Sequence, residues 1–499
     1  MSEARVNALR VLVLFWFAGV ALVTARHVTA YVDEAMLFSP ARNLILHGHM
    51  GTSIVDVTSE LREGMSLRGI DRYTYQIMPF SFLAQTAWYK LAGMGLFQLR
   101  ALSTLFGILG LLAWYTVFAK LGGNQAGALL AMAFIATDSL FVLAGAFGRN
   151  DMISASLAAA GIAAYVRWRE ERFLKAVLLS QCFVAASIFT HPAGVLGLSA
   201  VAILAVCLDR SRIGIKALML AAVPHLLAAG LWGLYILQAP DVFAEQMRTN
   251  AANRFGGFSA PLHAIWLEIR MRYLAEFGFR AGDGVVAHLK VILLVLYFAG
   301  PLAVLLTQAL RGRRTIRALL WIAAADFLIF SIIEGTKQGF YLVHVLPLLE
   351  GLLALWIVEA WSARPRLKPV LAAVAVLFLG MHVVRMAGVW RKDRLHTEYG
   401  ETVEFLKSNT TATQRTFGSC ELAFGLGFDA NLVDDHRLGY FSHKEADVVV
   451  VNDRYRELFE RMKIYQPEVS RYVEDLLRRQ FAKRYDHNGW QVYFRTPSH

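Results

Sequence analysis

Two adjacent carboxylates, Asp33 and Glu34, follow closely on the first long apolar run of the chain, residues 8–23. Ionisable side chains at the edge of a membrane-spanning segment are costly to keep there, so they are functional hypotheses by default. One carboxylate suffices as a general base that takes the proton from an acceptor hydroxyl during group transfer. The ordinary alternative is that the pair only ends a helix at the membrane interface.

Three further short segments between apolar runs carry isolated charges or histidines. A leaving phosphate needs cationic donors, which a single Arg or Lys can supply together with helix N-termini. The set therefore predicts group transfer from a lipid phosphate carrier, although each member could also be a surface ion pair, a helix-end residue or a packed histidine. The segments supply Arg149 and Asp151, then His191, and finally Lys337, Tyr341 and His344.

The composition indicates a membrane protein. Of the 499 residues, 56% are hydrophobic and only 18% are charged, and the mean hydropathy is +0.45. Soluble domains have about a quarter of their residues charged. The net charge of +12 would suggest a nucleic-acid partner in a soluble protein. Here much of that charge lies in short loops between apolar runs, which indicates membrane topology and no nucleic acid.

About eleven apolar runs are long enough, or nearly so, to cross the roughly 30 Å hydrocarbon layer as helices. Residues 77–93 are the doubtful case, because Gln85, Thr86 and Lys90 interrupt a short run. We interpret this segment as an interfacial amphipathic helix anchored by Trp88 and Tyr89. The runs are 8–27, 98–119, 125–147, 152–168, 173–190, 192–208, 214–238, 287–309, 316–333, 340–361 and 368–388.

The loop charges orient these helices. With 77–93 on the surface, the loops rich in Lys and Arg all fall on one side, which is the cytoplasmic side by the positive-inside rule. The opposite, outer side then receives the first loop, residues 28–97, and everything after residue 389. It also receives 148–151, 190–192, 239–286 and 334–339.

Five motifs, in this order, carry a resemblance to a known family. They are Asp33-Glu34 followed by ARNLILHG, then FQLRALSTLFGILG, GRNDM and FTHPAG, and more loosely KQGFYLVHVLP. Together they resemble the GT-C membrane glycosyltransferases of the protein O-mannosyltransferase and lipid A aminoarabinose transferase type, the glycosyltransferase family 39-like enzymes. The resemblance covers residues 8–360, and its specificity lies in the order and spacing of the motifs.

The resemblance implies an enzyme that transfers a sugar, with inversion, from a polyprenyl-phosphate donor to a lipid, glycan or protein acceptor. Asp33 matches the catalytic carboxylate that acts as general base, with Glu34 beside it, and Asp151 matches the second acidic position. The donor phosphate would be bound by Arg149 and Lys337, with Tyr341 and His344 nearby. His191 and Arg42 are further possible site residues.

Several details remain open. Ser39-Pro40 is expected to interrupt the first outer helix, near residues 34–47, so that it restarts at Pro40 and leaves the placement of Arg42 uncertain. The charged residues between His263 and Glu276 are interpreted as a solvated helix face. No cofactor is firmly predicted; His47 and His49 with a neighbouring carboxylate could bind a divalent metal, but their spacing matches no standard ligand pattern.

The expected fold is a polytopic α-helical membrane protein with a small soluble α/β domain. The membrane glycosyltransferase domain comprises residues 1–389 and the soluble domain residues 390–499. Within the latter, we predict strands at 447–451 and 490–495 and helices at 453–462 and 469–479. This domain has no phosphate-binding loop and is interpreted as a lid or acceptor-recognition unit.

The predicted location is the bacterial inner membrane, with the active site and the soluble domain on the periplasmic side, in contact with membrane lipids. The alternative function is secondary transport, but transporters place ionisable residues near the bilayer midplane and contain internal repeats. A third possibility is a membrane scaffold whose soluble tail carries the function.

Overall fold

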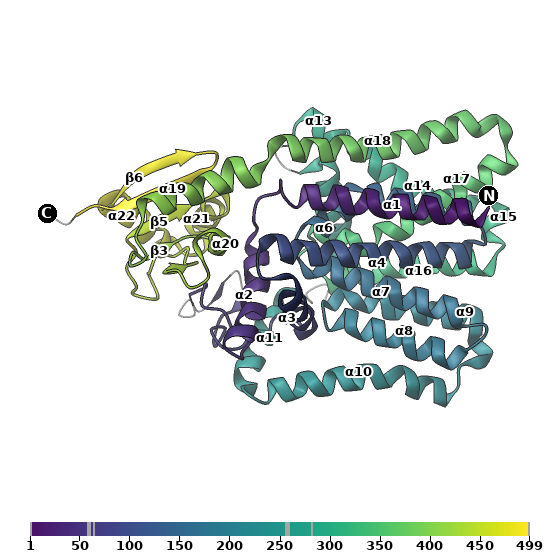
Figure 1. Ribbon diagram of the computed structural model, residues 1–499, viewed down its shortest axis with the longest axis horizontal. Helices are drawn as coiled ribbons and strands as arrows, with labels where there is room; N and C mark the ends of the chain where they lie inside the picture. Colours follow the sequence, from purple (N-terminus) through teal and green to yellow (C-terminus); the bar gives the residue numbers. More distant parts are fainter. Residues whose placement is uncertain (1, 57–60, 63–64, 255–259, 281–282, 498–499) are drawn as a thin grey trace.

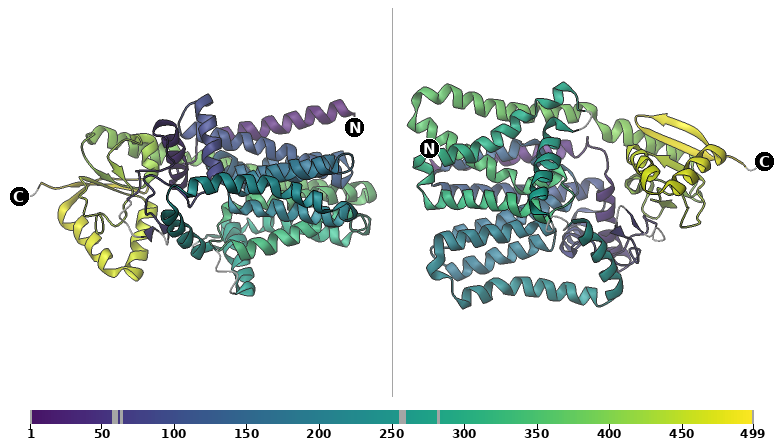
Figure 2. Two further views of the ribbon diagram at one scale, coloured as in Figure 1. Left: turned by 90° about the horizontal axis from the view of Figure 1, so that it is seen from below. Right: turned by 180° about the vertical axis from the view of Figure 1, so that it is seen from behind.

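The computed structural model describes residues 2–497 except 57–60, 63–64, 255–259 and 281–282. A bundle of long helices forms one part of the molecule, and a small unit of strands and helices lies beyond one end of it (Figure 1). The N-terminus lies at the opposite end of the bundle from this unit (Figures 1 and 2). The predicted fold class, a helical membrane protein with a small mixed sheet at its C-terminus, is confirmed.

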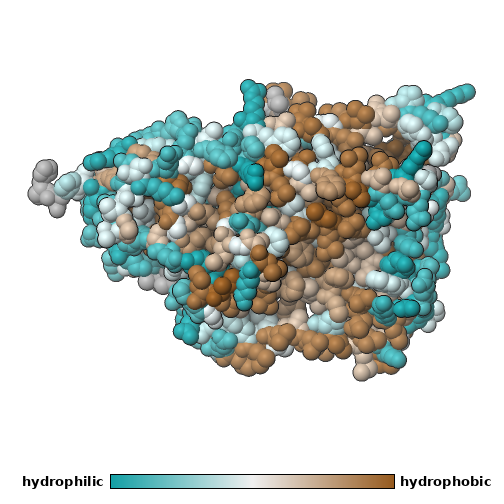
Figure 3. Space-filling model, viewed as in Figure 1, coloured by the Kyte–Doolittle hydropathy of each residue, from teal (hydrophilic) through white to brown (hydrophobic). Residues whose placement is uncertain are grey.

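The helices of the bundle are apolar on most sides, as lipid-exposed helices must be. In Figure 3 the bundle surface is mainly hydrophobic, whereas its two ends and the C-terminal unit are mainly hydrophilic. The long helices are α1 (Glu3–Thr24), α4 (Leu96–Gly122), α7 (Asn150–Trp168), α8 (Phe173–Ile188), α9 (Val195–Asp209), α10 (Ile215–Ile236), α14 (Val291–Leu306), α16 (Arg314–Ile333), α17 (Leu346–Ala363) and α18 (Lys368–Lys392).

Among the described residues, seven helices are long and apolar enough to cross a membrane, and an eighth span is possible if a bent pair is counted as one. Each of the predicted apolar runs contains a helix, but α8 and α14 are shorter than a full span. The chain is thus a multi-pass integral membrane protein. The count of about eleven transmembrane helices stays a prediction.

The bent pair consists of α5 (Gln125–Thr137) and α6 (Ser139–Ala146), which meet at 59°. Asp138 lies at the break and caps α6, because its Oδ1 accepts hydrogen bonds from the N–H groups of Leu140 at 2.6 Å and Phe141 at 2.9 Å. An Asp side chain that bonds the following backbone in this way favours a new helix start over continuation of the old helix. The break therefore has a local cause.

Helix α7 lies inside the bundle and packs along both α4 and α8. Most of its residues are buried, and many of them are Ala or Ser. Small side chains allow membrane helices to approach closely. Gly351 in α17 gives the tightest example, since a Cβ there would lie 1.8 Å from the ring of Phe118. Asp151 lies in the first turn of this buried helix.

The end of the bundle next to the C-terminal unit carries the long first loop and short helices. The expected helices near 34–47 and 77–93 are present as α2 (Val32–Leu46) and α3 (Pro79–Ala92). Between them, β1 (Leu61–Arg62) and β2 (Met65–Ser66) pair as antiparallel strands. The other short elements at residues 239–288 and 339–344 are α11 (Pro240–Arg254), α12 (Pro261–Leu267), the π-helix η4 (Glu268–Phe279), α13 (Val285–His288) and the 3-10 helix η5 (Gly339–His344).

The predicted interruption of the first outer helix at Ser39-Pro40 is wrong. Helix α2 continues through Pro40, which lies buried within it. Proline removes one backbone hydrogen bond from a helix. Tertiary contacts outweigh this loss here: the hydroxyl of Ser39 accepts a 2.6 Å hydrogen bond from Thr52, and the side chain of Asn43 donates to the carbonyl of Gly51 at 2.8 Å.

The C-terminal unit is built on a five-stranded sheet with the order β4-β3-β5-β7-β6. Strands β3, β4 and β5 are parallel, and β7 is antiparallel to both β5 and β6. The strands and helices predicted for this region are confirmed. Its elements are η7 (Leu395–Gly400), α19 (Glu401–Asn409), β3 (Thr416–Phe417), η8 (Cys420–Leu422), α20 (Ala423–Leu426), β4 (Leu432–Val433), β5 (Val448–Val451), α21 (Asp453–Tyr465), α22 (Pro467–Gln480), β6 (Phe481–His487) and β7 (Trp490–Arg495).

The C-terminal unit packs directly on the first outer loop. The N–H of Asp434 donates to the carbonyl of Ile54 at 2.8 Å. The ring of Phe38 in α2 packs against the ring of Phe428, with the centroids 4.7 Å apart. Helix α18 leads into this unit and ends at Lys392. The division into two domains between residues 389 and 390 stays a prediction.

Candidate active site

A pocket of about 590 Å³ opens at the end of the bundle next to the C-terminal unit. Its walls come from α2, the N-terminus of α7, the turn before the 3-10 helix η1 (Pro192–Gly194), η5 and the C-terminal unit. The pocket thus joins five segments that are far apart in the sequence. The lining residues that matter below are Asp33, Arg149, Asn150, His191, Tyr341 and Arg454.

Asp33 is the accessible carboxylate of this pocket. It lies in the first turn of α2, and 43% of its side-chain surface is exposed. Its Oδ2 pairs with a guanidinium nitrogen of Arg149. A carboxylate that is hydrogen-bonded on one side and open on the other can still accept a proton from a bound hydroxyl.

Arg149 bridges two carboxylates. Besides Asp33, it contacts Asp151 through an Nε–Oδ2 hydrogen bond of 2.7 Å, and only 7% of its side chain is exposed. Its guanidinium also lies 4.4 Å from the ring centroid of Phe340. Arg149 is thus held by both charge and ring contacts. Its planar donors suit it to bind phosphate oxygens.

Glu34 has a different environment from its neighbour, because it is completely buried and does not line the pocket. Its two oxygens accept hydrogen bonds from Arg100 at 2.8 and 2.7 Å, and its Oε1 also accepts the N–H of Gly148 at 2.7 Å. Gly148 precedes Arg149, so Glu34 ties the start of α2 to the loop that carries Arg149. Glu34 therefore has the contacts of a positioning residue, and its predicted catalytic role stays a prediction.

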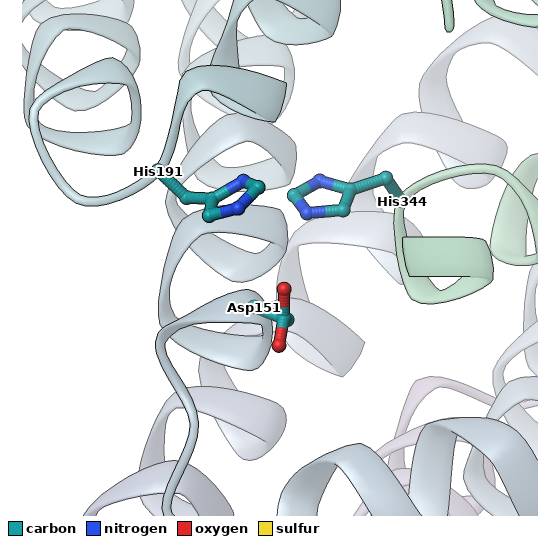
Figure 4. A group of neighbouring side chains, drawn as sticks. All are labelled: Asp151, His191 and His344. Atoms are coloured by element: carbon teal, nitrogen blue, oxygen red, sulfur yellow. The ribbon is translucent and has the colours of Figure 1, made fainter. Parts of the chain in front are cut away.

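Asp151, His191 and His344 form a compact buried group from three separate segments (Figure 4). One potential ligand atom from each residue lies within 4.8 Å of the others. The rings of His191 and His344 are 6.1 Å apart between centroids, and His191 also packs on Tyr341 at 5.0 Å. Four of the predicted site residues are thus adjacent. The sequence singled out each of them, but not their common group.

Lys337 lies beside the pocket, and its ammonium group is bound by other residues of the protein. Its ammonium group donates to the carbonyl of Ser331 at 2.5 Å and pairs with Glu268 at 3.1 Å. Burial lowers the pKa of Lys337 and, conversely, raises the pKa of Glu268, while their mutual attraction opposes both changes. The contact of Lys337 with a donor phosphate stays a prediction.

The interpretation of residues 263–276 as a solvated helix face is wrong for Glu268 and Arg272, which are fully buried. Arg272 pairs with Glu268 at 3.1 Å and with Glu334 at 2.5 Å. The two residues are four apart and so share one face of their helix. The sequence shows that Glu268 and Arg272 share a helix face. It does not show that Glu334, from another loop, covers this face.

Arg454, which the sequence did not single out, lines the pocket, whereas the predicted possible site residue Arg42 does not. Arg42 forms an ion pair with Asp429 and does not line the pocket. Arg454, from α21 of the C-terminal unit, lines the pocket and pairs with Asp434 at 3.3 Å. Nothing in the sequence around Arg454 indicates this position, because it depends on how the C-terminal unit packs against the bundle.

Comparisons with known proteins identify the fold. No protein-family model matches the chain, and no curated protein matches its sequence. The structure is similar to ArnT from Cupriavidus metallidurans bound to undecaprenyl phosphate, with 15% identity, a TM-score of 0.59 and coverage of 98% of this chain and 97% of that one. It is also similar to the archaeal oligosaccharyltransferase AglB from Archaeoglobus fulgidus in complex with an inhibitory peptide and a dolichol-phosphate. That match has 12% identity and a TM-score of 0.55, and it covers 98% of this chain and 74% of AglB.

At such low identity these matches establish the fold, which is the GT-C fold that ArnT and AglB share. The resemblance predicted from the sequence motifs is thereby confirmed at the level of fold, and it extends over nearly the whole chain rather than over residues 8–360 alone.

Proposed function

We propose that this protein is a membrane glycosyltransferase that transfers a sugar from a polyprenyl-phosphate donor to an acceptor, with inversion at the anomeric carbon. The observation that carries the proposal is the exposed carboxylate of Asp33, held by Arg149 at the edge of a pocket of about 590 Å³. The GT-C fold supports the same class of reaction, since ArnT and AglB are transferases studied with lipid phosphates bound.

In the proposed reaction Asp33 is the general base. Its carboxylate takes the proton of the acceptor hydroxyl as that oxygen forms a bond to the anomeric carbon. The bond between the anomeric carbon and the phosphate oxygen breaks, and the polyprenyl phosphate leaves with the electron pair. Attack from the face opposite the leaving group inverts the anomeric configuration.

Arg149 is the proposed ligand of the donor phosphate. It lines the pocket and is fixed by Asp151, so its charge is already in place when the phosphate develops negative charge. Arg454 supplies a second cation to the same pocket. We assign the phosphate to these two residues rather than to Lys337, because the ammonium of Lys337 is directed to Glu268 and Ser331.

The proposed location of this reaction is the outer face of a bacterial inner membrane, with the C-terminal unit in the periplasm. The charge asymmetry of the loops supports this orientation. Because the C-terminal unit forms part of the pocket wall, we propose that it helps to bind the acceptor, which would be a lipid, a glycan or a protein.

Complementation of a deletion strain tests the proposal. Mass spectrometry of its glycolipids and glycoproteins should reveal a sugar modification that the wild-type gene restores. Asp33→Asn should fail to restore it, with at least a hundredfold loss, while undecaprenyl phosphate still binds to the purified variant. Arg149→Gln should weaken that binding instead. Asp71→Asn, an exposed carboxylate of the same loop, is the matched control and should complement fully.

Complementation by Asp33→Asn at the wild-type level would contradict the proposal. The transporter alternative has less support, since the candidate site residues lie at one end of the bundle and the fold resembles transferases. Proton-coupled solute uptake by vesicles containing the protein would favour it. The scaffold alternative predicts that alanine at Asp33 and Arg149 has no effect.

A further inference from the structure

We propose that Asp151, His191 and His344 form a binding site for a divalent transition-metal ion, for which Zn²⁺ is the reference. The three side chains come from the N-terminus of α7, the turn before η1 and the end of η5, and they converge on one another (Figure 4). Of the three, His191 also lines the pocket. This proposal concerns metal binding and does not depend on the proposed sugar transfer.

The first argument is that one polar atom of Asp151 and one of His344 are buried and unsatisfied. Asp151 Oδ1 and His344 Nε2 have no hydrogen-bond partner, and each side chain is more than nine-tenths buried. A buried polar atom without a partner is destabilising and calls for an explanation, such as a bound ion. These two atoms belong to residues of the same three-membered group, so one ion would satisfy both.

The second argument is the distance between the donors. The candidate ligand atoms lie within 4.8 Å of one another. Ligands of Zn²⁺ at about 2.0–2.2 Å in a tetrahedron lie roughly 3.5 Å apart. Closing that difference takes a movement of about an ångström, which small side-chain rotations can provide.

The donor set determines which cation is suited. Two imidazole nitrogens and one carboxylate oxygen suit zinc and other first-row transition ions, whereas Mg²⁺ and Ca²⁺ prefer oxygen ligands throughout. Three protein ligands leave a fourth coordination position of the metal for water or substrate, which is typical of catalytic rather than structural zinc sites. We therefore expect Zn²⁺ to bind more tightly than Mg²⁺.

The metal and Arg149 can share Asp151. Arg149 binds Oδ2 of Asp151, and the oxygen without a partner is Oδ1. With neutral histidines, Asp33, Asp151 and Arg149 together carry a net charge of −1, and a divalent ion would change this to +1. A net positive pocket wall would attract an anionic ligand such as a phosphate.

Metal binding through Nε2 of His191 requires a change of the tautomer of its ring. Its Nδ1 accepts a 3.2 Å hydrogen bond from the N–H of Ala193, so in the absence of metal the proton of the neutral ring is on Nε2. Binding of a metal through Nε2 would move that proton to Nδ1 and break this long hydrogen bond. We therefore expect His344 and Asp151 to contribute more to affinity than His191.

The experiment uses the full-length protein in lipid nanodiscs, with an affinity tag that contains no histidine. After chelator treatment, Zn²⁺ is returned and measured by elemental analysis and by competition with a fluorescent zinc chelator. We expect one ion per chain, and at least tenfold weaker binding in His344→Ala and in Asp151→Asn. The double variant His47→Ala/His49→Ala is the matched control, since that pair lies outside the group, and it should bind as the wild type does.

Equal zinc binding by the wild type and His344→Ala would overturn the proposal, as would no zinc in the wild type or a loss only in the His47/His49 variant. Preference for Mg²⁺ over Zn²⁺ would also contradict it. If His344→Ala does not fold, the visible absorption spectrum of the Co²⁺-loaded wild type tests whether the metal site exists. Intense bands typical of a four-coordinate site support the proposal, and the weak spectrum of hydrated Co²⁺ overturns it.

Discussion

At the scale of single residues, Asp33 and Glu34 are adjacent in the sequence but lie in different environments, one exposed and one buried. Successive residues of an α-helix point about 100° apart. In α2 this difference directs Glu34 into the protein, against Arg100, and leaves Asp33 at the pocket. Removing one partner of a buried ion pair is strongly destabilising, so we expect changes at Glu34 to impair folding first, whereas changes at Asp33 affect catalysis.

Glu421 provides a pH-dependent prediction at the same scale. It is buried in the C-terminal unit, where it accepts hydrogen bonds from Ser419 and from Asn452, and burial raises the pKa of Glu421 from 4.5 to about 7. The folded protein therefore keeps the proton that the unfolded chain releases above pH 4.5. The stabilising contribution is complete below pH 4.5, declines as the pH rises to about 7 and is absent above it.

The difference corresponds to about 3 kcal/mol of unfolding free energy between pH 4.5 and 8. We expect Glu421→Gln, which stays uncharged, to have a flatter pH profile and to be more stable than the wild type at pH 8. The readout is the urea dependence of maleimide labelling at the buried thiol of Cys420, with Cys182 and Cys207 replaced by Ser. A wild-type profile that rises with pH over this range would contradict the prediction.

At the scale of elements, the break between α5 and α6 depends on a cap inside the bundle. Asp138 bonds two backbone N–H groups of α6 and also accepts a hydrogen bond from the hydroxyl of Tyr297. Water at a helix end can replace a lost cap, but the lipid-covered interior offers no such replacement. The cap at Asp138 should therefore stabilise the protein more than an exposed cap does.

We expect Asp138→Ala to lower the free energy of unfolding by about 2 kcal/mol or more, and Asp138→Asn, which keeps a capping oxygen, by less than half of that. Asn124→Ala removes the exposed cap of α5 in the same bent pair and should cost about 1 kcal/mol. Thermal unfolding in nanodiscs measures all three variants. A loss in Asp138→Ala no larger than that in Asn124→Ala would refute the role given to the buried cap.

At the scale of the whole molecule, the candidate site, the C-terminal unit and the first outer loop lie at one end of the bundle (Figures 1 and 2). The loops rich in Lys and Arg follow the other ends of the long helices, for example the 3-10 helix η2 (Arg210–Arg212) after α9. This separation is the basis of the proposed orientation across the membrane.

Cysteine accessibility tests that orientation. In a background without Cys182 and Cys207, Ser408→Cys in the C-terminal unit should react with a membrane-impermeant maleimide in intact spheroplasts. Ser211→Cys, in the loop after α9, should react only after the membrane is permeabilised. Both serines are exposed, which makes them a matched pair. The opposite labelling pattern would place the pocket on the cytoplasmic side.

Local patterns were sufficient for much of the fold. Apolar runs predicted the helices of the bundle, since a chain in lipid must satisfy its backbone hydrogen bonds within each segment. The sequence also predicted β5, which is a continuous apolar run, and β7, α21 and α22 of the C-terminal unit. The isolated charges in the loops also made Asp33, Arg149 and Asp151 candidate site residues, because charges are rare at such positions and each is visible on its own.

Contacts between distant segments were decided only by the tertiary structure. It determined that Asp33 rather than Glu34 lines the pocket, that Pro40 stays within a continuous helix, and that Arg454 reaches the site. It also brought Asp151, His191 and His344 together. The physical reason is that each of these outcomes depends on which helix faces pack against each other, and on the free energy of contacts between residues tens to hundreds of positions apart. A periodic pattern within one segment does not contain that information.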